Sequence, residues 1–566
     1  MNPTDRSAFP IDRAPRRLAF EGLMIGLLAL ALNLIGNDRI SLWDRDEPRY
    51  AGCTREMRAS GDLIHPTFNA QPRYHKPVLI YWLMLAGTAI GGDNPFGARL
   101  VSALAGTGTV LLVWAWGRRM LGDRAGRLAA LVLATAPIFV AESKLATTDA
   151  TLTFWVLGCQ LALWELCRRP SRLAAGVFWL FLGLAVLTKS PAGPALIGAS
   201  AVASWWWGGP TACWRRLCWR WGPLLALAVT LPWNLAILWR SEGAYYDVAV
   251  GYHIIQRATT GIEEHGAFPG YYVATGLATF FPWSAFLPAA VAAAWSRRRE
   301  DPRSGFLLGW LIGPLVLLEC VRTKLIHYYL PAFPAAALLT GWLAARVAAD
   351  LRPGALSSWR GGRAGCRTLA GVGIALTLGL LAAAFVLPTP LGPPAAALAA
   401  CFAAVTVLGT RDLHAGRTER AVHVIAAGTA LALAVGGGWL LPAAEPFRIS
   451  TVVGRKLSAY ESSERVPPVL CSFQTPGTVY ALGHPVPELR SVSEVVEAAS
   501  RKGKILAALL PQELAKLRDQ KSVVVNIRET VEGFDIEKGR IQTLHLAVIR
   551  PDTEAIAAAP PASARR

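Results

Sequence analysis

Long apolar runs alternate with short polar connections over the first three quarters of the chain. Runs of about twenty apolar residues are long enough to cross the hydrocarbon core of a bilayer as helices. We place thirteen such spans, at 18–36, 97–118, 125–141, 148–167, 173–188, 191–207, 221–239, 271–295, 304–320, 328–346, 368–387, 394–409 and 421–441. The pattern therefore predicts a polytopic α-helical membrane protein with about thirteen transmembrane helices.

The polar connections fall into two alternating sets that differ in arginine content. One set carries short arginine clusters, as in 118–127 and 297–303, and the polar segment 1–17 is similar. Short connections rich in Lys and Arg remain on the cytoplasmic side. The N-terminus is therefore expected inside, and the outer connections are 37–96, 142–147, 240–270, 321–327 and 388–393.

The stretch 78–92 is also apolar, but it does not fit as a fourteenth span. A crossing there would invert the sidedness of every later connection, and about 15 residues is short for a full crossing. We interpret it as an interfacial or re-entrant segment inside the first outer connection.

The chain changes character after residue 441, where it becomes polar with nearly balanced charge. V-P-P-V-L-C-S-F, S-V-V-V-N-I and L-H-L-A-V-I-R are typical of strands, and 492–500 and 511–519 are typical of helices. The alternation predicts a small α/β domain over 442–552, outside the membrane, followed by a disordered tail at 553–566. The transmembrane domain is 18–441, with a first outer loop at 37–96.

Composition agrees with a membrane protein and narrows the partners. The chain is 53% hydrophobic and 17% charged, with a formal net charge of +19. Most of the excess arginine lies in the short connections, so sidedness explains the charge and nucleic acid is not an expected partner. The nine cysteines form no CxxC pair and no zinc spacing, which argues against a disulfide framework. The first apolar run lacks a small-residue cleavage site and is expected to remain as a span.

The outer connections hold most of the candidate chemistry. Acids, bases and histidines beside a bilayer are costly unless they are used, so we expect Asp44 to Pro77 to form an active-site loop. Mixed carboxylates and cations suit an anionic, lipid-linked substrate, with Arg and Lys holding phosphate and a carboxylate serving as general base. The candidates are Asp46, Glu47, Arg49, His75, Lys76, Asp149, Lys189, His265, Lys324 and Tyr328.

Each candidate also has a plainer interpretation. The first loop could be an ordinary solvated, charged loop. Asp149 stands at the head of a span, where Asp is a favoured helix cap, and residue type alone does not separate the two roles. Lys324 could extend its ammonium from a helix end to the interface. His75 and His265 could be isolated histidines instead of a metal pair.

Several motifs resemble those of lipid-carrier-dependent glycosyltransferases of the GT-C type. D-E-P-R-Y-A at 46–51, R-E-M at 55–57, G-D at 61–62 and R-Y-H-K-P at 73–77 resemble the first outer loop of the bacterial undecaprenyl phosphate–aminoarabinose transferases of lipid A. The protein O-mannosyltransferases are more distantly similar. Further blocks follow in family order at 145–150, 187–191, 264–272 and 324–331. Thirteen spans with an outer α/β domain also resemble that architecture.

The resemblance implies a role for each matched residue. Asp46 matches the catalytic first-loop Asp, Glu47 lies in the same motif, and Asp149 matches a second functional acid. Arg49 and Lys76 match residues that hold the carrier phosphate. The block K-L-I-H-Y-Y-L-P adds Lys324 and Tyr328 to the predicted phosphate-binding set.

A metal site is a further expectation from the resemblance. In the aminoarabinose transferases the residue before the lysine is usually Glu and can help to bind a metal. This chain has His75 there, and His75 with His265 could bind Zn²⁺ or another divalent cation because imidazole is a good zinc ligand.

The expected activity is transfer of a sugar from a polyprenyl (undecaprenyl) phosphate carrier to lipid A or another envelope glycolipid. Asp46 would deprotonate a hydroxyl acceptor, or only position an acceptor phosphate that is already ionised. One alternative is transfer of mannose to secreted proteins. A lipid-linked sugar transporter is another, but transporters place polar residues near the midplane and often contain repeats, and neither pattern is seen.

Overall fold

The computed structural model describes residues 15–249, 267–350 and 352–552, which separate into two compact units. The first unit comprises Met1–Arg39, Asp62–His65 and Tyr74–Pro442. The second comprises Ile40–Gly61, Pro66–Arg73 and Ala443–Arg566. Two pieces of the predicted first outer loop therefore cluster with the C-terminal part of the chain.

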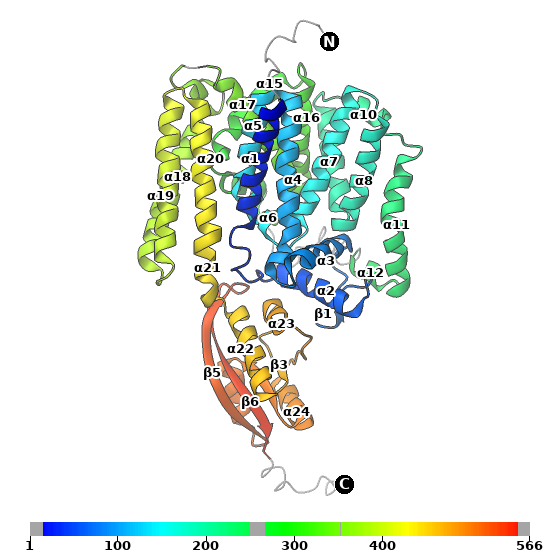
Figure 1. Cartoon of the computed structure of the whole chain (residues 1–566), viewed down its shortest axis with the longest axis vertical. Helices are drawn as coiled ribbons and strands as arrows, with labels where there is room; N and C mark the ends of the chain where they lie inside the picture. Colours follow the sequence, from blue (N-terminus) through cyan, green and yellow to red (C-terminus); the bar gives the residue numbers. More distant parts are fainter. Residues whose placement is uncertain (1–14, 250–266, 351, 553–566) are drawn as a thin grey trace. The chain divides into compact units, whose positions relative to one another are not determined.

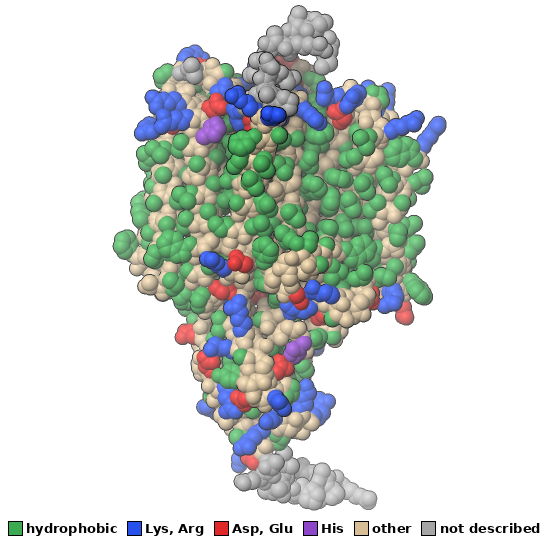
Figure 2. Space-filling model, viewed as in Figure 1, with side chains coloured by type: hydrophobic (Ala, Val, Ile, Leu, Met, Phe, Trp, Pro, Cys, Tyr) green, Lys and Arg blue, Asp and Glu red, His purple; other side chains and the backbone are tan. Residues whose placement is uncertain are grey.

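The first unit is a bundle of helices that lie side by side (Figure 1). Hydrophobic side chains cover the visible face of the bundle, and Lys and Arg gather at the end where α1 begins (Figure 2). Its principal helices are α1 (Pro15–Leu34), α3 (Leu79–Gly91), α4 (Pro95–Leu121), α5 (Asp123–Ala134), α6 (Pro137–Lys144), α7 (Asp149–Arg168), α8 (Arg172–Lys189), α9 (Ala192–Trp206), α11 (Gly222–Arg240), α14 (Tyr271–Thr279), α15 (Leu287–Arg297), α16 (Pro302–Cys320), α17 (Phe333–Val347), α18 (Gly362–Val386), α19 (Gly392–His414) and α20 (Thr418–Val435).

Within the described residues, ten helices are long and apolar enough to cross a membrane. They coincide with ten of the thirteen predicted spans. The predicted span 125–141 is instead two helices, α5 and α6, which meet at a bend of 59°. Pro137 explains the break, because proline lacks an N–H and disfavours helical geometry in the residue before it. The span predicted at 191–207 is the 15-residue α9, and the one at 271–295 is divided between α14 and α15.

Burial differs sharply between helices of this bundle. In the segment Leu330–Val347, which contains α17, 94% of the residues are buried inside the protein, whereas in the apolar window of α18 only 11% are buried. A helix that is apolar on all sides and buried lies at the centre of a bundle, while an apolar helix with little protein cover is suited to lipid. The stretch 78–92 forms the 13-residue α3, which is short for a full crossing.

The second unit contains a four-stranded mixed sheet in the order β3-β4-β6-β5. Its strands are β3 (Pro468–Leu470), β4 (Ile505–Leu509), β5 (Val523–Asp535) and β6 (Arg540–Pro551). β3 and β4 are parallel, and the other two pairs are antiparallel. The helices are α22 (Ile449–Glu464), α23 (Pro476–Leu482), α24 (Val492–Lys502) and α25 (Pro511–Arg518).

Side-chain alternation along β4 divides the helices between the two faces of the sheet. Leu506 and Ala508 pack with residues of α22 and α23, whereas Ile505 and Ala507 pack with α24 and α25. The strands and helices predicted after residue 441 are present. β4, α22 and α23 were not predicted. For β4 the reason is that a five-residue apolar run, I-L-A-A-L, does not show its type by periodicity.

The stretch predicted as an active-site loop is partly a helix, which corrects that expectation. α2 (Asp46–Ser60) occupies its first part, followed by the short strands β1 (Thr67–Phe68) and β2 (Gln71–Pro72). Two acids stand in the first turn of α2, Arg58 stands in the last turn, and Gly61 follows at φ 72°. Charges placed in this order stabilise the helix dipole, and a glycine at positive φ is a frequent helix terminus.

Candidate functional site

A cavity of about 340 Å³ lies in the first unit, among the ends of α7, α8, α11 and α16. This volume is in the range of small-molecule sites. Its charged or ionisable lining residues are His75, Lys76, Asp149, Lys189, Tyr245, Tyr246 and Tyr328. The rest of the lining is mostly aliphatic and includes Leu152, Val186, Leu196, Leu317, Leu318 and Val321. The cavity therefore combines a few polar groups with an apolar wall.

Asp149 and Lys189 form the central ion pair of this cavity. The distance from Lys189 Nζ to Asp149 Oδ1 is 2.8 Å, and both side chains are largely buried. The same ammonium lies 4.8 Å from the centre of the Tyr328 ring, a cation–π contact. Thr148, not Asp149, occupies the position before the first residue of α7. Asp149 therefore opens the helix, and its carboxylate is engaged by a residue of another helix instead of capping its own.

Lys76 gives the cavity an excess of positive charge. Lys76 and His327 both lie close enough to Asp149 to act electrostatically on its carboxylate. Among the lining residues, the two lysines outnumber the single carboxylate, so the lining carries a net charge of +1 with histidine neutral. An anionic group is the natural ligand of such a lining, because Lys supplies mobile point charges for phosphate.

The cavity also brings together polar residues that sequence reasoning did not assign. Lys189 was among the candidates, but its pairing with Asp149 was not predicted. Tyr246 donates a hydrogen bond of 2.8 Å to Asn234 Oδ1 at the cavity wall. Thr323 is buried, and its hydroxyl has no hydrogen-bond partner among the described residues. Tyr246, Asn234 and Thr323 are uncharged, so the charge pattern of the sequence did not indicate them.

The structure separates the two residues predicted from the block at 324–331. Tyr328 lines the cavity, whereas Lys324 does not. The Lys324 ammonium donates to the backbone carbonyl of Glu319 at 3.0 Å and pairs with its carboxylate at 3.1 Å. The same carboxylate accepts the N–H groups of Gly270 and Tyr272. Lys324 thus pairs with the carboxylate that also binds the backbone at the start of α14.

Asp46, Glu47 and Arg49 all belong to α2 in the second unit. Asp46 is exposed, whereas Glu47 is buried and accepts the backbone N–H of Trp43 at 2.6 Å. Arg49 is half-buried, and burial followed by the neighbouring Arg73 lowers the pKa of its guanidinium, while Asp46 opposes that shift. Asp46 is thus the motif acid open to a substrate, and Glu47 has a local structural contact.

Of the two histidines predicted to bind a metal, the structure describes one. His75 lines the cavity, but His265 lies outside the described residues. Within the described ranges, no three His, Cys, Asp or Glu side chains come together as a metal-ion site. The residues present do not by themselves form a complete ligand set, so the chemistry considered below takes no step through a metal.

Comparisons with known proteins agree with the resemblance seen in the motifs. A family model described as dolichyl-phosphate-mannose-protein mannosyltransferase matches residues 75–239. An undecaprenyl phosphate-alpha-4-amino-4-deoxy-L-arabinose arabinosyl transferase of Pseudomonas aeruginosa is 34% identical over 317 residues, which is 53% of this chain and 55% of that protein. A transferase of the same name from Erwinia tasmaniensis is 30% identical over 56% of this chain and 58% of its own length. The chain therefore spans about half the length of the curated relatives it matches.

Solved structures establish the fold over nearly the whole chain. The crystal structure of ArnT from Cupriavidus metallidurans bound to undecaprenyl phosphate superimposes with a TM-score of 0.74 at 22% identity, covering 97% of this chain and 100% of that one. The apo structure of the same protein gives a TM-score of 0.75. The predicted GT-C fold class, a helical membrane domain with a C-terminal α/β unit, is confirmed, and the chain is a multi-pass membrane protein.

Proposed function

We propose that this protein is a membrane glycosyltransferase that moves a sugar from polyprenyl (undecaprenyl) phosphate to a lipid A-like glycolipid. The observation that carries the proposal is the cavity in which Lys76 and the Asp149–Lys189 pair lie beside an aliphatic wall. A phosphate joined to an isoprenoid chain presents both the anionic and the apolar surface that such a lining accepts. The matched relatives, named as undecaprenyl phosphate–aminoarabinose transferases, support this donor class.

The lysines provide the main electrostatic stabilisation in this scheme. As the bond between the sugar and the phosphate breaks, negative charge grows on the departing phosphate. A positioned cation that meets this charge lowers the barrier, since it stabilises the transition state more than the ground state. Lys76 is assigned this role, and Lys189 forms an ion pair with Asp149 beside it. Tyr328, stacked on Lys189, completes the phosphate-binding wall.

The acceptor side of the reaction is assigned to α2 on the strength of its motif. Asp46 orients the acceptor, and it also removes a proton if the acceptor is a hydroxyl. Arg49, on the same helix, belongs instead to the donor side, because it matches a position that holds the carrier phosphate. A guanidinium retains its charge even when burial lowers its pKa. Glu47 and Lys324 remain predicted site residues, although each has a structural contact of its own.

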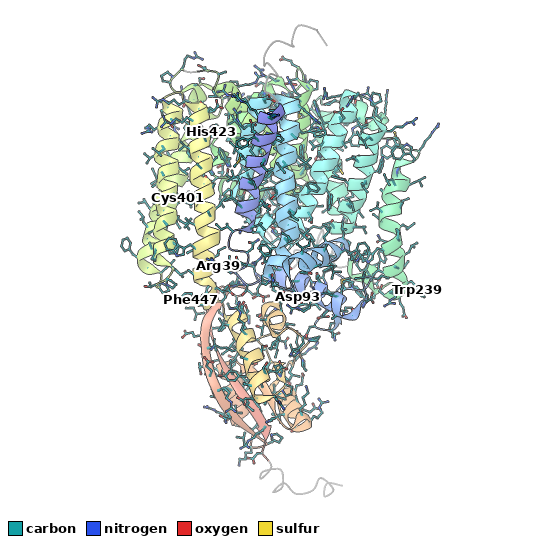
Figure 3. The ribbon with its side chains drawn as sticks, in the orientation of Figure 1. Arg39, Asp93, Trp239, Cys401, His423 and Phe447 are labelled. Atoms are coloured by element: carbon teal, nitrogen blue, oxygen red, sulfur yellow. The ribbon has the colours of Figure 1, made fainter. Side chains whose placement is uncertain are left out.

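The same proposal includes an orientation in the inner membrane, with the N-terminus in the cytoplasm and the site and C-terminal unit in the periplasm. The arginine asymmetry between the connections supports it. Asp93 and His423 are exposed at opposite ends of the bundle (Figure 3). Cysteines placed at these positions, after removal of the nine native ones, should react oppositely with a membrane-impermeant thiol reagent added to intact spheroplasts. Labelling at His423 alone would contradict the orientation.

A divalent metal bound by His75 and His265 stays a prediction. Its test is to compare transfer before and after chelation, with Zn²⁺ returned to the treated protein, in wild type and in His75→Ala. Restoration of transfer by Zn²⁺ in wild type but not in the variant would support the site. Full activity after chelation would remove the metal from the scheme.

A transfer assay in proteoliposomes tests the function as a whole. The donors are a panel of undecaprenyl-phosphate sugars, and the competing acceptors are lipid A and a Ser/Thr-rich peptide. We expect label on lipid A in wild type and its loss in Asp46→Asn and Lys76→Ala. Label on the peptide would favour protein mannosyl transfer, the alternative supported by the family model over residues 75–239. Full transfer by both variants would contradict the site.

A further inference from the structure

Helix α2, which carries Asp46 and Arg49, clusters with the C-terminal part of the chain and not with the helices that flank it in sequence. Within the second unit it is attached at three places, each involving a residue that sequence reasoning left without a role. One attachment lies in the residues before the helix, one lies on the helix itself, and one lies between the short strands β1 and β2 that follow it.

The first attachment is the carboxylate of Asp44, two residues before Asp46. Asp44 is buried and accepts the N–H of Gly477 at 2.6 Å, and it also accepts a hydrogen bond from the Ser450 hydroxyl. A larger residue at 477 would displace this carboxylate, because a Cβ atom there would lie 2.6 Å from Asp44 Oδ1. The start of α23 and the start of α22 thus both bind this one carboxylate.

Arg448 fixes the chain immediately before Asp44. Its guanidinium donates to the carbonyls of Ser41 and Leu42 at 3.0 and 2.6 Å, and lies over the Trp43 ring at 5.0 Å. Arg448 is itself 4% exposed and is held by Glu445 at 3.0 Å. A planar guanidinium with several donors can orient three successive residues in this way, which a single point charge cannot.

The remaining two attachments hold the middle of α2 and the β1–β2 segment that follows it. Arg55 donates to the carbonyl of Tyr480 at 2.9 Å and lies over the ring of the same residue at 4.0 Å. Asn69 makes two hydrogen bonds with the backbone of Val486, of 2.7 and 2.9 Å. The Glu56 carboxylate of α2 accepts the N–H of Asn69 at 2.7 Å, so the helix and the β1–β2 segment are also joined to each other.

We propose that the C-terminal unit is the scaffold that fixes α2, with Asp44 as the positioning residue that sets where Asp46 and Arg49 lie. The inference rests on the proposed function, in which these two residues serve the transfer. It assigns the C-terminal domain a task, which is to hold α2 rigid from the side of α22 and α23. Asp44 takes no part in the chemistry itself.

The effect of burial on the Asp44 carboxyl agrees with a positioning role. Burial raises the pKa of Asp44 above its ordinary value, even though Ser450, Arg448 and Gly477 favour the ionised form. A carboxyl whose pKa is raised by folding lowers the stability of the folded protein when it is ionised at neutral pH. A negative charge on Asp44 would therefore bring no gain in stability, whereas the hydrogen bonds of its side chain with Gly477 and Ser450 fix the geometry.

The experiment compares three variants of the full chain in nanodiscs. Asp44→Ala removes the acceptor of Gly477 and Ser450, and Asp44→Asn retains an acceptor and serves as the conservative rescue. Glu513→Ala is the matched control, because Glu513 is also a buried carboxylate of this unit and accepts a backbone N–H, that of Leu510 at 2.8 Å. Glu513 stands in α25, on the sheet face opposite to α22 and α23. Hydrogen exchange of peptides covering α2 and β4 is measured together with sugar transfer.

In Asp44→Ala we expect amide exchange in α2 to rise by about tenfold while β4 stays protected. Transfer should fall by about 10- to 100-fold, the size of effect produced by small displacements of catalytic groups. Asp44→Asn should restore most of both, and Glu513→Ala should leave α2 exchange unchanged. Unchanged α2 exchange in Asp44→Ala, or an equal loss of transfer in Glu513→Ala, would overturn the proposal.

The two readouts separate this inference from the proposed function. Exchange needs no substrate, so it decides the anchoring of α2 even when no donor is accepted. A wild-type protein that transfers sugar while Asp44→Ala transfers equally well keeps the function and removes the positioning role. A wild-type protein without transfer activity counts against the function, and the exchange then judges the scaffold alone.

Discussion

Two buried carboxylates, Asp149 in the first unit and Asp44 in the second, show how the same group serves different ends. Asp149 is paired with a cation, Lys189, and both side chains line a cavity. Asp44 is bonded to a backbone N–H and a hydroxyl of its own unit. A charge pair left facing an open volume can act on a ligand, whereas a carboxylate bonded only within the chain acts on the position of the backbone. Partner type and the presence of a cavity, more than burial, distinguish a candidate binding group from an anchor.

The largest expected effect comes from breaking the ion pair in the cavity. Lys189→Met leaves Asp149 buried without its partner, which should lower the free energy of unfolding by about 3–5 kcal/mol. Thermal unfolding in nanodiscs measures the loss. The double variant Lys189→Met with Asp149→Asn should recover most of that stability but not transfer activity. If the double variant is no more stable than the single one, the two residues do not form a coupled pair.

Removal of the second cavity lysine should affect activity and not stability. Lys76→Ala is expected to reduce sugar transfer by about 100- to 1000-fold, because a charge that meets the departing phosphate is lost. Lys456→Ala is the matched control, since Lys456 is a partly exposed lysine paired with Glu529 at 2.6 Å in the second unit. Initial rates over a range of donor concentrations provide the measurement. Equal losses in both variants would show that lysine removal acts through the fold.

Crowding the anchor should produce an intermediate effect. A methyl group at 477 would collide with the Asp44 carboxylate, so Gly477→Ala should cost about 1–3 kcal/mol of unfolding free energy. The same substitution should cost less in an Asp44→Ala background, where the colliding atoms are absent. Chemical denaturation of the four proteins gives this coupling directly. Additive effects would mean that the two residues are not in contact.

The smallest effect is expected at an exposed pair of the second unit, His484 and Glu461, whose side chains are 2.8 Å apart. The hydrogen bond to Glu461 and that to the Pro485 carbonyl raise the pKa of His484 above 6.5. The pair therefore contributes stability below pH 6.5, and the contribution is lost as the pH rises through the raised pKa. About 0.2–1 kcal/mol is expected for so exposed a pair. Unfolding of wild type and Glu461→Gln at pH 6 and pH 9 should differ only at pH 6.

The sequence predicted the helices of the first unit well because a membrane leaves the backbone few alternatives. An apolar run in lipid must satisfy its N–H and C=O groups internally, which a helix does. Ten of the predicted spans are accordingly single helices. The bend at Pro137 and the division of 271–295 were not predicted, although the proline that explains the first was visible in the sequence. Helix α2 was not predicted because its composition is charged. Its end signals, which are the acids of the first turn, Arg58 in the last turn and Gly61 after it, are nevertheless present in the sequence.

The sequence predicted part of the ionisable lining of the cavity but not its arrangement. The motifs identified Lys76, Asp149 and Tyr328, and all three line one cavity. Lys324 belongs to the same block as Tyr328 and does not line it, since Glu319 engages its ammonium. A block in the sequence records which residues are near one another along the chain, and it does not show which way each side chain points.

Residue order and residue type by themselves determined the apolar spans, the alternation of arginine-rich and arginine-poor connections and the motif that contains Asp46. Only the tertiary structure decided how the two aspartates of D-R-D-E-P-R differ, with Asp44 buried against residues more than 400 positions later and Asp46 exposed on α2. It also decided that Lys189 meets Asp149 from 40 positions away. Periodicity and charge act locally along the chain, whereas burial and pairing depend on which segments the fold brings together.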